Sequence, residues 1–187
     1  MVKTPHIFRT IALVLPLLSS GAVAEEMSSV YTPLKLEACE NVTPPEAAEF
    51  GGVFRCKGYG GTDVRVAEGD LRMFVSYGPN AHNQTAASQT LPAFNTTGET
   101  LEWRLANDGE PFATILRFHW DSDGAKGSTL VVTKLGTGDS CHVAHVMTTG
   151  NPNANVLARE IADGQARGFD CARDRMRSYG ADGKQAD

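Results

Sequence analysis

Hydrophobic and polar residues alternate in several short stretches of this chain, and the alternation is strongest in a series near the middle. Strands are predicted over 101–106, 112–120, 128–135 and 141–148, with turns rich in Gly and Asp between them. In the second of these strands one face carries Phe112, Thr114, Leu116, Phe118 and Trp120, and the other carries Ala113, Ile115, Arg117 and His119. Because short turns join neighbouring antiparallel strands, the series predicts a four-stranded meander.

Shorter strands are predicted ahead of this series. Residues 53–56 form one of them. Residues 62–67 (TDVRVA) and 71–77 (LRMFVSY) form an antiparallel hairpin with a three-residue loop at 68–70. Residues 78–100 show no clear periodicity, and we expect them to be the least regular part of the domain.

One segment has helical periodicity, at about 153–167. Its apolar face consists of Ala154, Leu157, Ala158, Ile161 and Ala162. The preceding Asn-Pro-Asn sequence supplies a capping residue and a first-turn proline, and Gly168 is a natural end point. The predicted fold is therefore α+β: a curved antiparallel sheet of six to eight strands with one C-terminal helix packed against it. The alternative is a small β-barrel or sandwich with an appended helix.

The N-terminus has the three parts of an export signal. Two basic residues precede an apolar run over 11–18, which is followed by an Ala-Val-Ala sequence ending at Ala24. This order predicts a signal peptide over 1–24, cleaved after Ala24. The remaining chain is predicted to contain one globular domain over 25–171 and a polar, flexible tail over 172–187.

The charge of the chain narrows the classes of partner. The formal net charge is −5, and loss of 1–24 with Lys3 and Arg9 would make it −7. An acidic domain gains nothing from a phosphate backbone, so nucleic acid is not an expected partner. No segment after residue 24 is long and apolar enough to be predicted as a membrane span.

Four cysteines follow the predicted signal peptide: Cys39, Cys56, Cys141 and Cys171. An even number in an exported chain predicts disulfides, and four cysteines allow three pairings. We favour Cys39–Cys56 and Cys141–Cys171. A strand over 141–148 would rise about 26 Å, and the following helix would return about 22 Å, which brings Cys171 back level with Cys141. A four-cysteine zinc site is the rival, but no two cysteines have the short spacing that such sites use.

Two histidines, His142 and His145, lie three residues apart in the last predicted strand. On a regular strand their side chains point to opposite faces, so they could share a metal ion only if the strand were irregular. No metal site and no cofactor is therefore predicted. The sequence DSDG at 121–124 resembles the start of a calcium loop but lacks the later ligands, and a hairpin turn is the better interpretation.

Motifs of nucleophilic or metal-dependent hydrolysis, such as G-x-S-x-G and H-E-x-x-H, do not occur in the sequence. The chain is accordingly predicted not to be an enzyme. A hydrolase that uses His119 or His145 is the catalytic alternative. The paired carboxylates Glu68 and Asp70 are expected at a solvated hairpin tip, where nothing would shift their pKa for acid–base work.

Surface aromatic residues in loops are the candidate contacts. Tyr59 lies between glycines in the turn GYGG, and with Gly60, Gly61 and Phe94 it forms the predicted binding surface. Rigid disulfide-tied β domains often bind through such loops.

Several segments carry a resemblance to a known family: SVYTPLKLEAC, CKGYGGTDVRVAEGDLRMFVSYG, PFATILRF, CHVAHV and NPNANVLAREIADGQARGFDC. Over about residues 29–175 the chain resembles an uncharacterised family of small exported proteins of alphaproteobacteria. The resemblance implies a periplasmic location and brings with it no known activity or catalytic residues. The predicted function is a non-catalytic periplasmic module that binds a protein or another envelope component, and a periplasmic metal-binding protein is a further alternative.

Overall fold

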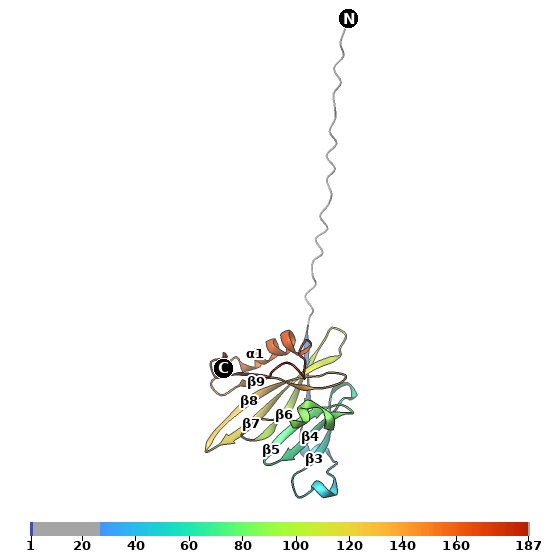
Figure 1. Ribbon diagram of the computed structural model, residues 1–187, viewed down its shortest axis with the longest axis vertical. Helices are drawn as coiled ribbons and strands as arrows, with labels where there is room; N and C mark the ends of the chain where they lie inside the picture. Colours follow the sequence, from blue (N-terminus) through green and yellow to red (C-terminus); the bar gives the residue numbers. More distant parts are fainter. Residues whose placement is uncertain (2–26, 187) are drawn as a thin grey trace.

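The computed structural model describes Met1 and residues 27–186, and over these residues the chain forms two β-sheets and one α-helix (Figure 1). The larger sheet has the order β1-β6-β7-β8-β9-β10-β11 and the smaller one the order β2-β3-β4-β5. The strands of the larger sheet are β1 (Ser28–Pro33), β6 (Phe94–Leu105), β7 (Pro111–Ser122), β8 (Ala125–Lys134), β9 (Cys141–Met147), β10 (Arg177–Tyr179) and β11 (Gln185–Ala186). Those of the smaller sheet are β2 (Glu40–Asn41), β3 (Val53–Lys57), β4 (Asp63–Gly69) and β5 (Arg72–Tyr77).

The larger sheet is the middle of three layers. Helix α1 (Ala154–Ile161) covers one of its faces, and the smaller sheet packs on the other (Figure 1). The core on the helix side includes Ile115, Leu130, Val132, Val143 and Ile161. The core between the sheets includes Val64, Val75, Trp103, Leu116 and Phe118. The predicted α+β fold with a C-terminal helix is confirmed. Among the described residues neither sheet closes into a barrel.

The predicted meander is also confirmed, because β6, β7, β8 and β9 are consecutive antiparallel neighbours. The two faces of β7 separate as the alternation predicts, with Leu116 and Phe118 between the sheets and Ile115 under the helix. Phe112 is an exception, since it packs on the helix side rather than with Leu116. The ladder pairs Leu105 with Pro111 and Arg104 with Ala113, so Phe112 is an extra residue in a bulge and shares the side of its neighbour.

The predicted helix is confirmed, with small side chains on its buried face. The residues that pack on the sheet, Ala154, Ala158 and Ile161, are each less than 3% exposed. The chain continues in a π-helical turn over Ala162–Ala166. Asn151 supplies the side-chain hydrogen bond ahead of the helix. The side chain of Asn151 accepts a hydrogen bond from the backbone N–H of Asn153, whereas the Asn153 side chain makes no capping bond.

Two segments that were predicted to be irregular contribute strands. In the 78–100 segment, short 3₁₀ turns occupy Ala81–Asn83 and Thr85–Ser88, but the chain is already in β6 from Phe94. In the tail, β10 pairs in parallel with β9, and β11 pairs with β10. The expectation of a frayed tail was therefore wrong for these residues. A three-residue strand has too few side chains to show an alternation, and its stability comes from the backbone groups of the neighbouring edge.

Both predicted disulfides are confirmed. Cys39 is bonded to Cys56 across 17 residues, and Cys141 to Cys171 across 30 residues. Two disulfides fit an oxidising, exported environment. Helices of membrane-spanning length and apolarity do not occur among the described residues. The predicted signal peptide and its cleavage after Ala24 lie outside the described part of the chain and stay predictions.

Candidate functional site

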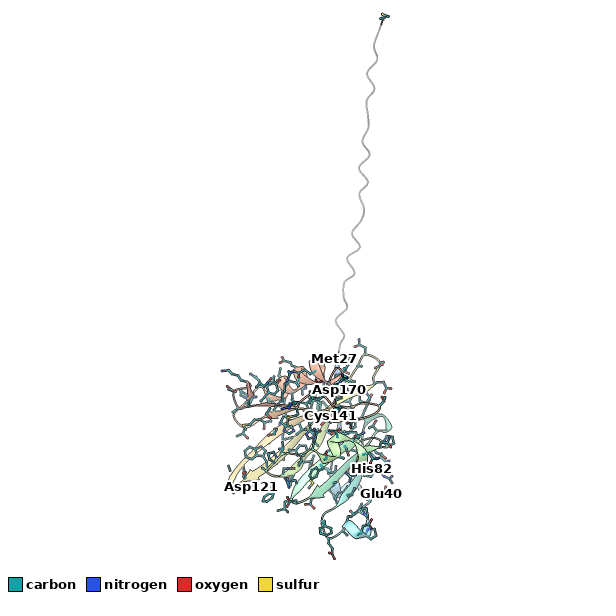
Figure 2. The ribbon with its side chains drawn as sticks, in the orientation of Figure 1. Met27, Glu40, His82, Asp121, Cys141 and Asp170 are labelled. Carbon is teal, nitrogen blue, oxygen red and sulfur yellow. A yellow bond between two sulfur atoms is a disulfide. The ribbon has the colours of Figure 1, made fainter. Side chains whose placement is uncertain are left out.

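A pocket of about 600 Å³ opens where the β4–β5 hairpin of the smaller sheet meets the ends of β6, β7 and β8. We call it the inter-sheet pocket. Its apolar lining consists of Leu71, Met73, Phe94 and Trp120, and its polar lining includes Glu68, Asn95, His119, Asp121 and Lys126. Figure 2 shows Asp121 at the tip of the long strands, on the side of the molecule away from helix α1.

Asn95 fixes the position of the hairpin against β6. Its backbone N–H donates to the carbonyl of Leu71 at 3.0 Å, and its side-chain oxygen accepts from the backbone N–H of Met73 at 3.0 Å. The Asn95 side chain also donates to the carbonyl of Ala93 at 2.8 Å. Asn95 is 5% exposed, so these bonds are shielded from water. The pocket is therefore built on a fixed junction between the two sheets.

The tip of the β4–β5 hairpin is a two-residue turn of Asp70 and Leu71, not the predicted three-residue loop at 68–70. Both residues have left-handed φ, 53° for Asp70 and 59° for Leu71. Such a turn matches strand twist, and its usual residues are Asn and Gly because side chains resist this conformation. Leu71 is 64% exposed and lines the pocket. The turn therefore holds an apolar side chain in the pocket at a steric cost to the backbone.

Phe94 is the predicted contact residue that the structure places in this pocket. It is 54% exposed at the start of β6. Leu71 and Trp120 were missed by sequence reasoning, since both look like ordinary strand residues. The exposed side chain of Leu71 and the half-burial of Trp120 follow from where the two sheets end. The Trp120 Nε1–H donates to the hydroxyl of Thr129 at 3.1 Å, which fixes its ring.

Tyr59, Gly60 and Gly61 do not join Phe94. Tyr59 is half-buried and packs against Trp103 with ring centroids 6.4 Å apart. Gly60 and Gly61 form an exposed turn beside it with φ of 59° and 81°. The GYGG turn thus places an aromatic ring over the inter-sheet core, and none of these three residues lines the inter-sheet pocket.

The charged groups of the pocket lie at its rim and partly compensate one another. The Asp121 carboxylate and the Lys126 ammonium are 3.3 Å apart and exposed. One oxygen of Glu68 accepts from the backbone N–H of Leu71 at 3.1 Å. The His119 side chain forms no hydrogen bond with the described residues and is exposed. These polar groups surround an apolar floor and are not arranged as a nucleophile with its base.

The two histidines of β9 do not lie as predicted. The β8–β9 ladder pairs Val132 with Ala144 and Thr133 with His142, so Val143 is an extra residue in a bulge. Val143 and Ala144 both pack on the helix side. His142 and His145 consequently point to the same face, and the His142 Nδ1 and His145 Nε2 atoms are 2.9 Å apart. The prediction of opposite faces was wrong because it assumed a regular strand.

Both imidazole rings are buried, His142 at 2% and His145 at 9% exposure. Burial, together with the neighbouring His145 ring, lowers the pKa of His142 to about 3. Burial lowers the pKa of His145 to about 4. Both rings are therefore neutral at pH 7, and each keeps a lone pair on one nitrogen.

Clusters of three or more His, Cys, Asp or Glu side chains that could hold a metal ion do not occur within the described residues. Comparison of the chain with protein-family models, curated proteins and solved structures gives no match.

Proposed function

We propose that this protein is a non-catalytic binding module of the periplasm, and that it holds an apolar or aromatic group of its ligand in the inter-sheet pocket. The observation that carries the proposal is that two exposed apolar side chains, Leu71 and Phe94, line one cavity of ligand size with Trp120. Pockets of this volume with an apolar lining and a few polar groups are typical of small-ligand sites.

The rim indicates which ligands fit. The charges of Asp121 and Lys126 offset each other, and Glu68 adds a carboxylate that forms no ion pair with the described residues. The whole chain is acidic as well, with a formal net charge of −5. An anionic ligand would meet like charge at this mouth, so we expect neutral or cationic amphipathic ligands.

The geometry gives little support to a hydrolase built on the two candidate histidines. The imidazole of His119 forms no hydrogen bond with the described residues that would orient it as a base. His145 Nε2 faces His142 rather than a hydroxyl nucleophile. A general base must lie within hydrogen-bond reach of the group whose proton it takes, and neither ring is hydrogen-bonded to a hydroxyl of the described residues.

The proposal is tested with a neutral apolar fluorophore, N-phenyl-1-naphthylamine, titrated into the purified protein. We expect saturable binding with quenching of Trp120 emission. Replacing Phe94 with alanine should weaken binding about tenfold, since it removes about one buried aromatic contact. Val156→Ala is the matched control, because Val156 is 53% exposed on helix α1, outside the pocket lining. Equal affinity of the Phe94→Ala and wild-type proteins would overturn the proposal.

A second prediction concerns the cost of presenting Leu71. Replacing Leu71 with glycine should raise the free energy of unfolding by about 1 kcal/mol, because glycine accepts the left-handed φ without steric cost. The same change should weaken fluorophore binding, since it removes an apolar wall. Urea denaturation and the fluorophore titration measure the two effects.

The control for this trade-off is Asp123→Asn in the β7–β8 turn. Asp123 also has a left-handed φ, of 51°, but does not line the pocket. The Asp123→Asn variant should leave the fluorophore affinity unchanged. Unchanged fluorophore affinity in Leu71→Gly would show that Leu71 has no binding role, and a lower stability would show that its left-handed φ carries no steric cost.

A further inference from the structure

We propose that His142 and His145 bind a monovalent copper ion, with the thioether of Met176 as a third donor. This site is separate from the inter-sheet pocket and does not depend on the function proposed for it. It lies in a second pocket, the histidine pocket, whose lining includes Arg72, Phe74, Gln89, His142, His145 and Met176.

The separation of the two ring nitrogens fits a shared metal ion. Two imidazole nitrogens bound at about 2.0 Å to one ion lie about 3.3 Å apart in tetrahedral geometry. The observed distance of 2.9 Å between His142 Nδ1 and His145 Nε2 is within a few tenths of an ångström of that value. If the proton between the two rings moves to the other nitrogen of its own ring, both facing nitrogens offer a lone pair to the ion and both rings stay neutral.

The bulge at Val143 is what aims both rings at one point. A regular strand would place them on opposite faces, and the extra residue returns them to the same face. Bulges occur frequently next to functional sites, where they re-aim a side chain. Apart from their mutual contact, the two rings make no side-chain hydrogen bond with the described residues. Burying two imidazoles for one hydrogen bond is costly, and a bound ion would compensate for that cost.

The Cys141–Cys171 disulfide brings the third donor to the histidines. Cys141 directly precedes His142, and Cys171 lies five residues before Met176. Strand β10 follows immediately and pairs in parallel with β9, with Ser178 opposite His145. Met176 is 37% exposed, so its side chain has room to move toward an ion.

The donor set selects copper in its lower oxidation state. The histidine pocket has no carboxylate in its lining, and all four cysteines are in disulfides, so every available donor is neutral. Arg72 is the one charged lining residue among those described, and its guanidinium is paired with Asp70. A divalent ion would keep two uncompensated charges here, whereas a monovalent ion keeps one. Imidazole with thioether is a soft set that suits Cu(I).

The test is an anaerobic titration of the purified protein with Cu(I), kept reduced by ascorbate, in competition with the chromogenic chelator bicinchoninate. We expect one copper ion per chain. His145→Leu should abolish binding. His82→Gln and His119→Gln are matched controls, because neither residue lines the histidine pocket, and both should bind like the wild type.

Met176→Leu keeps the test decisive if His145→Leu does not fold. Because Met176 is partly exposed, this variant should fold normally and bind Cu(I) about tenfold more weakly or worse. X-ray absorption of the copper-loaded wild type should show sulfur in the first coordination shell, and the variant should lack it. Failure of the wild type to compete with bicinchoninate would overturn the proposal and leave an ordinary hydrogen-bonded pair. One-to-one binding of Zn²⁺ in preference to Cu(I) would overturn the assignment of the ion. Unchanged Cu(I) affinity in Met176→Leu would overturn the assignment of the third donor.

Discussion

Replacing Trp103 with alanine is expected to lower the free energy of unfolding by about 3–5 kcal/mol, among the largest effects of a single substitution in this chain. Trp103 is 0% exposed between the two sheets. Its ring is edge-on to Tyr77, with centroids 5.8 Å apart, and Tyr59 covers it from another side. Its Nε1–H donates to the hydroxyl of Thr32 at 2.8 Å, so alanine would also leave that hydroxyl unpaired.

Urea denaturation followed by far-ultraviolet circular dichroism measures this effect. Val156→Ala is again the control, because an exposed helix position should change stability by no more than about 0.5 kcal/mol. The GYGG turn should loosen in the Trp103 variant, since Tyr59 would lose its neighbour. If the free energy of unfolding of Trp103→Ala fell by less than about 1 kcal/mol, the packing of the two sheets would not depend on this ring.

The second large effect is expected from removal of the Cys141–Cys171 disulfide. In the double variant Cys141→Ala/Cys171→Ala the free energy of unfolding should fall by about 4 kcal/mol. The reason is that the bond closes a loop of 30 residues in the unfolded chain. It also joins the start of β9 to the segment after the helix, so the packing of α1 on the larger sheet should weaken with it.

The Cys39–Cys56 bond offers a matched comparison within the same chain. This bond closes a loop of 17 residues and should contribute about 3 kcal/mol to the free energy of unfolding by the same relation. Denaturation of both double variants under identical conditions gives the comparison. If removing the longer loop cost less than removing the shorter one, strain or residual structure would outweigh loop closure in this protein.

Local patterns in the sequence were enough for the elements that have many residues and two distinct faces. The alternation in 112–120 predicted that Leu116 and Phe118 would share a face, and both lie between the sheets. The 3.6-residue period predicted the buried face with Ala158 and Ile161. A strand followed by a returning helix also predicted the pairing of Cys141 with Cys171, because the lengths of the two elements match.

The candidate sites were less accessible to sequence reasoning. Tyr59 and Phe94 are both aromatic residues in segments that were expected to be loops, and nothing local separates them. One packs on Trp103 and the other lines a cavity, because the two sheets meet at one place and diverge at another. The paired imidazoles depend on one unpaired residue, Val143, and the sequence of β9 contains no glycine or proline that would signal a bulge.

The sequence by itself thus determined the strands with strong alternation and the face of the helix, and it favoured the pairing of the cysteines that the structure has. These follow from the repeat of one element or from the distance between two neighbouring elements, and both are local quantities. The tertiary structure decided the division into two sheets, the pairing of the tail with β9, the walls of the inter-sheet pocket and the meeting of His142 with His145. The sheets, the tail pairing and the pocket walls depend on contacts between segments that are distant in sequence. The two histidines meet because of a shift in register between β8 and β9, and a shift of one residue moves a side chain to the opposite face.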